Sequence, residues 1–323
     1  MKFTQVYILG SEYLKALNNE PQTTNISLEY NSIPKVFFDT IKIGIIKSNL
    51  IAMFAGLSLA LYVFNASVLA NIVPIVLSFL GSSLIIGAAG VFNNLYDRDI
   101  DAIMERTKKR PTVTGRVDTK SGLILGITIT LIGAVMLYIA SPSAAVFGIL
   151  GLLLYVFPYT MWTKRTTIYN TEVGSLSGAV PPLIGWAAIS PDLGHFEIWA
   201  LVVTMLLWQM PHFYGIAIRR FDEYKAAGVP MLPVVKGIGR TYVQSNVYLV
   251  LLLLSSFLFW PMSPFIAIVA FLVTLAWLIL SVTTFDPKDT KKWSQRMFIF
   301  SINHITIIFL VIIAYSLIAQ LMR

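Results

Sequence analysis

The amino-acid sequence predicts an all-α, polytopic membrane protein with nine transmembrane helices. Hydrophobic residues make up 56% of its 323 residues and charged residues only 12%, whereas soluble domains carry about 25% charged residues. The mean hydropathy is +0.74. Apolar stretches close to the ~20 residues that cross a bilayer recur along the chain, and polar loops separate them. The chain contains no cysteine, which excludes disulfides and cysteine-based metal sites.

Nine apolar stretches are the candidates for spanning helices. The fifth is short and interrupted by glycine and proline, including Pro181 and Pro182, so we expect neighbouring helices to shield its backbone. Residues 1–40 are polar and lack the basic-then-apolar pattern of a signal peptide, which predicts a cytoplasmic N-terminal segment. Residues 41–323 are expected to form one nine-helix intramembrane domain. The nine stretches are 45–64, 68–92, 122–139, 144–161, 173–188, 199–217, 243–260, 264–282 and 297–317.

The distribution of basic residues predicts on which side of the membrane each loop lies. Every Lys and Arg except Arg323 lies before the first stretch, at its start, or in alternate loops. The other loops carry Asp192 and Glu197 but no basic residue. By the positive-inside rule, we expect the N-terminus inside the cell and the C-terminus outside. Because topology accounts for the net charge of +8, a nucleic-acid partner is not indicated.

A polar stretch between the second and third apolar stretches carries the strongest functional signal. Asn93, Asp97 and Asp101 are spaced four residues apart, so on a helix their side chains share one face. The two carboxylates repel each other, and a divalent cation removes that conflict. Mg²⁺ is usually held by one or two carboxylates together with substrate phosphates. These three residues are therefore predicted to bind Mg²⁺ with a diphosphate, and the alternative is a solvated, charge-rich loop.

Basic residues follow the acids along the chain, in the order that a metal–diphosphate site requires. The same loop continues with a cluster of cations that can neutralise phosphate charge. A short loop after the fourth stretch lies on the same predicted side of the membrane. Its polar residues either contact a diphosphate or simply anchor the topology. The predicted substrate-binding residues of these two loops are Arg106, Lys109, Arg110, Lys164, Arg165 and Asn170.

A second polar stretch begins inside the sixth apolar stretch. No proline follows His212 before residue 228, so one helix is expected to continue out of the membrane. At about 100° per residue, Gln209, His212, Arg219 and Glu223 then lie on one face, whereas Asp222 points away from Glu223. Polar residues inside a membrane are costly, which favours a functional role. The alternative for His212 is a hydrogen bond between helices that stabilises packing alone.

The motifs resemble those of the UbiA-type intramembrane prenyltransferase superfamily. The first polar stretch is similar to its N-x-x-x-D-x-x-x-D motif, and residues 106–111 look like its R-T-x-x-R-P continuation. The runs WQMPHF at 208–213, EYKAAGVPMLPVVKG at 223–237 and NTEVGSLSGAVPPLIGW at 170–186 resemble the branch that farnesylates haem. The resemblance covers nearly the whole chain after about residue 40.

The resemblance implies a substrate pair and a set of residue roles. Farnesyl diphosphate, haem B and water are expected to give haem O and diphosphate, with Mg²⁺ as cofactor. Asp97, Asp101 and His212 are the expected catalytic residues, and His212 is expected to ligate the haem iron or act as a base. Gln209, Arg219, Asp222 and Glu223 are expected to bind substrate. The resemblance also implies a cell-membrane location, a cytoplasmic active site, contact with the lipid bilayer and a haem A synthase as partner.

One departure from the superfamily pattern and three competing functions remain. Many members carry a second motif with two acids four residues apart, whereas this loop has only the adjacent Asp222 and Glu223. The nearest alternative is a prenyltransferase that acts on an aromatic quinone precursor, which the WQMPHF run disfavours. A CDP-alcohol phosphotransferase would need further acids, and a transporter would not explain acids followed by bases. Release of diphosphate by purified protein separates an enzyme from a transporter.

Overall fold

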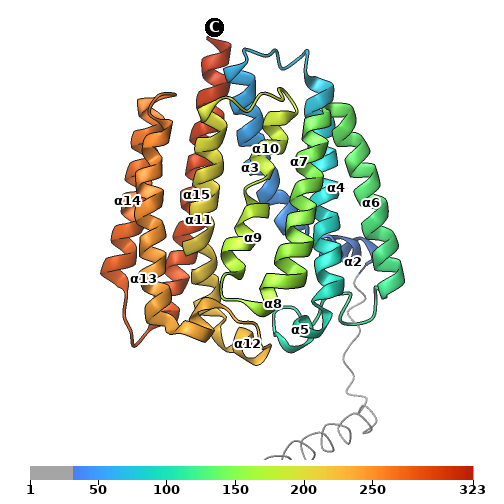
Figure 1. Cartoon of the computed structure of the whole chain (residues 1–323), viewed down its shortest axis with the longest axis vertical. Coiled ribbons are helices and arrows are strands. Elements are labelled where there is room, and N and C mark those ends of the chain that lie inside the picture. The colour runs from blue at the N-terminus through green and yellow to red at the C-terminus, as the bar shows by residue number, and fades with distance from the viewer. Residues whose placement is uncertain (1–31, 323) are drawn as a thin grey trace, which may run out of the picture. The chain divides into compact units, whose positions relative to one another are not determined.

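The computed structural model describes residues 32–322, and all of its regular elements are helices (Figure 1). Residues 1–31, which hold most of the predicted N-terminal segment, lie outside the described part of the chain. The elements are α2 (Ile33–Thr40), α3 (Ile43–Val63), α4 (Ile72–Tyr96), α5 (Arg98–Ile103), α6 (Thr119–Ala140), α7 (Pro142–Leu154), the π-helix η1 (Tyr155–Thr163), α8 (Lys164–Thr166), α9 (Asn170–Gly178), α10 (Pro181–Ala187), α11 (Phe196–Arg219), α12 (Phe221–Ala226), α13 (Leu232–Ser255), the 3₁₀ helix η2 (Ser256–Phe259), α14 (Pro264–Thr284) and α15 (Thr290–Leu321).

Eight helices in residues 32–322 are long and apolar enough to cross a membrane. They are α3, α4, α6, α7 with its continuation to Thr166, α11, α13 with η2, α14 and α15. The predicted fifth span is divided into the short helices α9 and α10, which follow one another within the bundle (Figure 1). The structure therefore confirms a helical protein with eight long apolar helices. The count of nine passes stays a prediction.

The broken fifth segment is shielded by its neighbours, as its glycines and prolines predict. Every residue of α10 is buried. A Cβ atom on Gly185 would lie 2.0 Å from the Met53 carbonyl oxygen of α3, and one on Gly56 would lie 2.1 Å from the Pro182 oxygen. The backbones of α3 and α10 are thus in direct contact, and no side chain fits between them. This contact supports the unwound point between α9 and α10 inside the apolar core.

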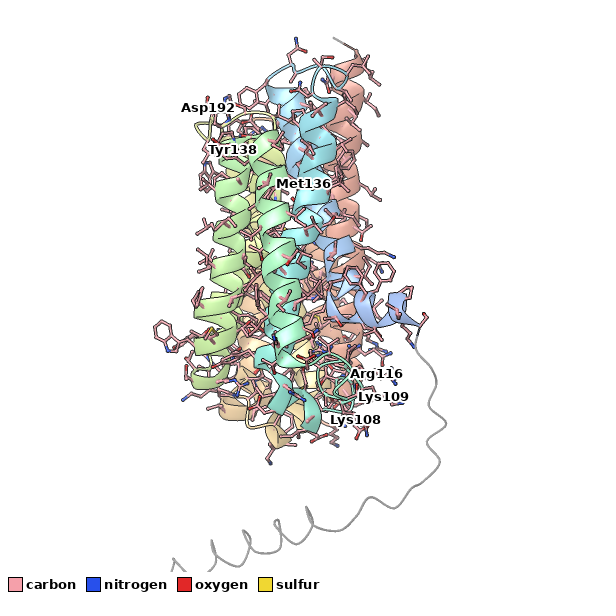
Figure 2. All side chains as sticks on the ribbon, turned by 90° about the vertical axis from the view of Figure 1, so that its right-hand side faces the viewer. Lys108, Lys109, Arg116, Met136, Tyr138 and Asp192 are labelled. Carbon is pink, nitrogen blue, oxygen red and sulfur yellow. The ribbon has the colours of Figure 1, made fainter. Side chains whose placement is uncertain are left out.

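The two ends of the bundle formed by residues 36–322 differ in charge. The short helices α5, α8 and α12 all lie at one end (Figure 1), which we call the polar end. Lys108, Lys109 and Arg116 lie at this end, whereas Asp192 lies at the opposite end (Figure 2). The tertiary structure therefore brings α5, α8 and α12 to the same end of the bundle, although they are far apart in the sequence.

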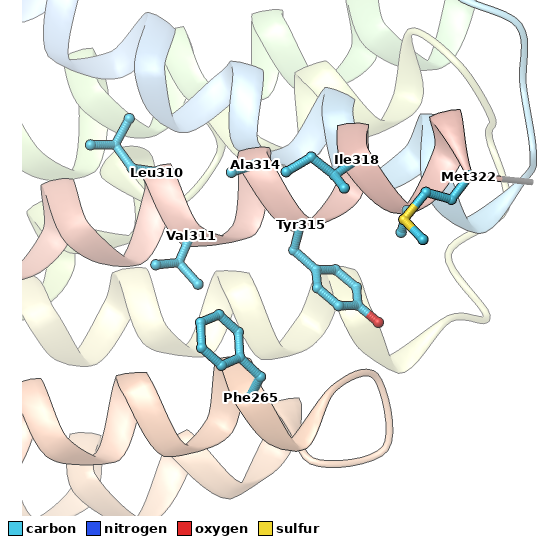
Figure 3. A pocket seen from close by; sticks show the side chains of 8 residues that line it. Phe265, Leu310, Val311, Ala314, Tyr315, Ile318 and Met322 are labelled. Atoms are coloured by element: carbon cyan, nitrogen blue, oxygen red, sulfur yellow. The ribbon is translucent and has the colours of Figure 1, made fainter.

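A shallow groove runs between α14 and α15, near the end of the bundle opposite the polar end (Figure 3). Its lining is apolar except for Tyr315, whose hydroxyl donates to the Met262 carbonyl oxygen at 3.4 Å. A groove with this lining suits contact with lipid chains and offers no group for diphosphate chemistry. Deeper in the same helix pair, His304 bonds to Thr274 at 2.8 Å, which is a helix–helix hydrogen bond.

Candidate active site

The acid motif lies where α4 ends and α5 begins. Asp97 is the C-cap residue of α4. The helical pattern of backbone hydrogen bonds continues through it, because Asp97 N donates to Asn93 O at 2.9 Å and Asp101 N donates to Asp97 O at 2.8 Å. The three side chains therefore stay on one side of the chain, as their spacing predicts. All three are buried, with 3%, 0% and 3% of Asn93, Asp97 and Asp101 exposed. Buried carboxylates require cationic partners or a metal ion.

The orientation of the Asn93 amide leaves its oxygen free for a cation. Its Nδ2 donates to Asp97 Oδ2 at 2.7 Å and to Thr160 Oγ1 at 3.1 Å. Thr160 belongs to the π-helix η1, which contains Pro158, and local π-turns are frequent at functional sites. Because both amide hydrogens are used, Asn93 Oδ1 remains as an acceptor, and the Lys42 ammonium donates to it.

Cations from two other segments neutralise the two carboxylates. The Lys164 ammonium of α8 pairs with Asp97, and an Arg110 guanidinium nitrogen lies 2.5 Å from Asp101 Oδ2. Arg165 lies 3.5 Å from Asp97 and 2.7 Å from Asp99. Its hydrogen bonds lower the pKa of Asp99 to about 2, and this carboxyl is therefore ionised at neutral pH. The predicted residues Lys164, Arg165 and Arg110 thus meet the acid motif.

Other predicted phosphate ligands do not contact the acids. Arg106 and Lys109 are exposed at the polar end. The Asn170 side chain instead ties loops together, since its Nδ2 donates to the Thr167 oxygen at 2.8 Å and the Pro230 oxygen at 3.3 Å. Contact of Arg106, Lys109 and Asn170 with the substrate therefore stays a prediction.

Lys42 is a residue of this site that the sequence did not reveal. It follows α2 in the left-handed conformation, with φ 57°, and turns the chain into α3. The Asn94 amide donates to the Thr40 oxygen at 2.9 Å, and Gly90 leaves room for the Ile41 carbonyl. Burial, and then the charges of Arg110 and Lys164, lower the pKa of Lys42 well below its ordinary value. In the sequence, Lys42 looked only like a positive-inside residue.

The chemistry of these donors fits a magnesium ion. An amide oxygen and two carboxylates are the hard oxygen ligands that Mg²⁺ prefers. In the structure, the side chains of Lys164 and Arg110 provide the positive charge that the buried acids need, and Lys42 contacts the Asn93 amide oxygen. The side chains of Arg110 and Lys164 are long and partly exposed, at 19% and 16%, so they can turn to a phosphate once a metal ion binds the acids.

The second polar stretch does not continue as one helix. α11 ends at Arg219, and α12 begins at Phe221, with Arg220 at φ −108° and ψ 25° between them. The prediction of a helix that continues past residue 219 is therefore wrong. The turn lets the second polar loop fold over the first, and the two loops share an apolar cluster. This cluster contains Ile100 and Met104 of the first loop with Ala217, Val229 and Met231 of the second.

The residues of the predicted polar stripe consequently contact two different helices, α9 and α15. Gln209 donates to the Ser175 oxygen of α9 at 3.1 Å and to the Met205 oxygen at 2.9 Å. His212 faces α15 instead, where its Nδ1 lies 2.7 Å from Ser301 Oγ, and its ring stacks on Trp208 at 4.6 Å. This bond is the helix–helix contact of the alternative interpretation, and the haem role of His212 stays a prediction.

The charged residues of the second polar stretch also have separate partners. The Arg219 guanidinium lies over the Phe298 ring of α15, 4.3 Å from its centroid. Glu223 pairs with Arg220 at 2.6 Å, and Asp222 lies 3.4 Å from Lys291 at the exposed surface. None of these contacts reaches the acid motif directly.

The structure also contains a buried polar network between α9, α11 and α13 that the sequence did not reveal. The Tyr214 hydroxyl donates to Glu172 Oε1 at 2.6 Å, and Gln244 Nε2 donates to the same oxygen at 3.0 Å. The other oxygen, Glu172 Oε2, is buried without a hydrogen-bond partner. The signal that could have identified Glu172 is an acid directly before the apolar, proline-interrupted stretch 173–188.

Comparison with known proteins places this geometry in a family. The UbiA prenyltransferase family matches residues 49–303, which is most of the chain. This chain belongs to the UbiA prenyltransferase family. A relative from Shouchella clausii named protoheme IX farnesyltransferase is 61% identical over 287 residues, covering 89% of this chain and 92% of the relative. Protoheme IX farnesyltransferase 2 of Lysinibacillus sphaericus is 54% identical over 310 residues, covering 95% and 98%.

Solved structures share the UbiA fold at low identity. A structure described as digeranylgeranylglyceryl phosphate synthase has a TM-score of 0.68 at 16% identity and covers 88% of this chain and 98% of its own. A UbiA homologue from Archaeoglobus fulgidus, bound to GPP and Mg²⁺, has a TM-score of 0.65 at 13% identity and covers 88% and 99%. These similarities establish the fold, and membership of the UbiA family makes this chain a prenyltransferase.

Proposed function

We propose that this enzyme transfers the farnesyl group of farnesyl diphosphate to a vinyl group of haem B, with addition of water, to give haem O and diphosphate. Relatives at 54–61% identity over most of the chain carry the name protoheme IX farnesyltransferase. The structural observation that supports prenyl transfer is the buried acid motif, whose three side chains contact Lys42, Lys164 and Arg110. Buried acids with movable cationic partners suit a metal–diphosphate ligand.

The reaction requires a carbon–oxygen bond to break before two new bonds form. The bond between farnesyl C1 and the diphosphate oxygen breaks, and its electron pair leaves with the diphosphate. The terminal vinyl carbon of haem B then bonds to farnesyl C1. Water bonds to the adjacent vinyl carbon and loses a proton, which the departing diphosphate can accept. The first step needs stabilisation of the negative charge that develops on the leaving group.

Asn93, Asp97 and Asp101 would hold Mg²⁺, which supplies part of this charge stabilisation. Lys164 and Arg110 would exchange their carboxylate contacts for diphosphate oxygens, and Lys42, which precedes α3, would exchange its contact with the Asn93 amide oxygen. Their positions beside the acids, within reach of one bound ion, support this assignment. Arg106, Lys109, Arg165 and Asn170 are proposed to bind substrate from the rim of the site, as the sequence predicts.

The second polar stretch is proposed to serve the haem acceptor at its inner end, His212, and the diphosphate at its outer end, Arg219 and Glu223. His212 would contact haem B, and Gln209, Arg219, Asp222 and Glu223 would line the path between the apolar interior and the polar end. The support is their placement on α11 and α12, which pack over the first polar loop. His212 would have to exchange its bond with Ser301 to ligate iron or accept a proton.

We further propose the finer topology. The protein would lie in the cell membrane with nine passes, counting α9 and α10 together, and with the polar end in the cytoplasm. The support is the position of Lys108, Lys109 and Arg116 at that end, with Asp192 at the opposite end (Figure 2). Residues 1–40 would form a cytoplasmic segment and 41–323 the prenyltransferase domain. The surrounding bilayer would supply farnesyl diphosphate and accept haem O, and a haem A synthase would use the product.

Mass spectrometry of haems tests the proposed function. Cells that lack their own haem O should accumulate it when they express this chain, and the purified protein with farnesyl diphosphate, haem B and Mg²⁺ should release diphosphate. An Asp97→Ala, Asp101→Ala double variant at equal folded amount is the control. Absence of haem O in the cells together with absence of diphosphate release by the purified protein would contradict the proposal. Prenylation of an aromatic quinone precursor instead would leave prenyl transfer intact and change the acceptor.

A further inference from the structure

The two acids of the second polar loop are already engaged with separate cations. Glu223 accepts a hydrogen bond from Arg220 at 2.6 Å, and its side chain is 17% exposed. Asp222 lies on the surface, 79% exposed, and 3.4 Å from Lys291. Adjacent residues on a helix point about 100° apart, so both acids cannot approach one ion from the same side. This loop therefore does not repeat the buried carboxylate pair of the first loop.

Two arginines at the same end have no anionic partner. Arg219 lies over Phe298, and its Nε is buried without a hydrogen-bond partner. Met104 and Ala217, each two residues before one of these arginines, pack in one apolar cluster, so the segments that carry Arg106 and Arg219 lie together. Within residues 32–322, neither Arg106 nor Arg219 forms an ion pair with a carboxylate. Like charges held together without a counterion favour the binding of an anion between them.

We infer that Arg219, with Arg106 from the first loop, binds the diphosphate in place of a second carboxylate-bound Mg²⁺, so that the site takes one divalent ion for each farnesyl diphosphate. This inference rests on the proposed function. A guanidinium group is always charged and can donate two parallel hydrogen bonds to a phosphate. It can neutralise the leaving group without carboxylate ligands of its own.

The phenyl ring of Phe298 positions Arg219 for this task. A guanidinium that rests on an aromatic face keeps its edge free, and the hydrogen-bond donors lie on that edge. The guanidinium of Arg220 differs, because it already forms an ion pair with Glu223. Of the two adjacent arginines, Arg219 is thus the one that is available to an incoming diphosphate. The single ion would be held by Asn93, Asp97 and Asp101.

Counting the divalent ions tests this inference without relying on turnover. The full-length protein in lipid nanodiscs would be titrated with Mn²⁺ and farnesyl thiolodiphosphate, an unreactive analogue, and followed by electron paramagnetic resonance. We expect one bound Mn²⁺ per protein, with the spectrum of an isolated ion. Two ions at the roughly 3.5–4 Å separation of two-metal sites would give a spin-coupled spectrum. A coupled pair in the wild-type protein would overturn the inference, and its loss in Glu223→Gln would place the second ion on the second loop.

Affinity for the same analogue at saturating Mn²⁺ tests Arg219 itself. Loss of a charged hydrogen bond should weaken binding about 10- to 100-fold in Arg219→Gln, and Arg219→Lys should recover part of this loss. Lys225→Gln is the matched control, because it removes one exposed positive charge from the same loop. Equal affinity in wild type, Arg219→Gln and Lys225→Gln would remove Arg219 from the site. If wild-type protein does not bind the analogue at all, the proposed function itself fails.

Discussion

Asp97 combines a structural role and a proposed metal-binding role, and two substitutions can separate them. Its side chain is fully buried, accepts a hydrogen bond from Asn93 at 2.7 Å and pairs with Lys164, whose side chain is 16% exposed. Asp97→Asn should leave the Lys164 ammonium without its counterion. Breaking a buried ion pair by removing one partner costs about 3–5 kcal/mol, and the partial exposure of Lys164 places the expected cost near the lower limit, at about 3 kcal/mol.

The double variant Asp97→Asn, Lys164→Met removes both charges and should recover most of the lost stability, because no unpaired ammonium remains. Its turnover should stay at least about a thousandfold below wild type, since the carboxylate that holds the metal is still missing. Thermal unfolding in nanodiscs, followed by tryptophan fluorescence, measures the first effect, and release of diphosphate at saturating Mg²⁺ measures the second.

Lys164→Met alone is the matched control, because Lys164 is itself proposed to contact the diphosphate. It should lose activity but retain Mg²⁺-dependent binding of the substrate analogue, whereas Asp97→Asn should lose that dependence. If Asp97→Asn, Lys164→Met binds the analogue with wild-type Mg²⁺ dependence, the assignment of Asp97 as a metal ligand is refuted. Recovery of turnover together with stability would mean that Asp97 serves the fold alone.

Three further outcomes are expected. Gly185→Ala should reduce the yield of folded protein, because the added Cβ would lie 2.0 Å from the Met53 oxygen. Gly239→Ala should not reduce it, because no atom lies within 4 Å of the added Cβ, and size-exclusion profiles compare the two variants. His212→Ala should weaken haem B binding while farnesyl diphosphate binding is kept, and unchanged haem affinity with an unchanged absorption spectrum would leave His212 as a packing residue. A Lys108→Cys variant of this cysteine-free chain should react with an impermeant thiol reagent from the cytoplasmic side, and labelling from outside alone would overturn the topology.

The sequence by itself determined what depends on local periodicity and composition. The four-residue spacing of Asn93, Asp97 and Asp101 follows the pitch of a helix, so their common face was predictable without any tertiary contact. The apolar stretches were equally predictable, because a helix that crosses lipid must satisfy its own backbone hydrogen bonds. The shielding of the segment around Pro181 followed from the same requirement.

Only the tertiary structure decided which distant residues meet. Lys42 reaches Asn93 because the chain turns at residues 40–42 and packs against Gly90, and no local pattern encodes that approach. The end of α11 at Arg219 depends on the packing of the two polar loops, which periodicity along one helix does not register. His212 turns to α15 because Ser301 offers it a hydrogen bond from a segment 89 residues away. Helical periodicity specifies which face of a helix a residue occupies, whereas the neighbour on that face is specified by packing among segments far apart in the chain.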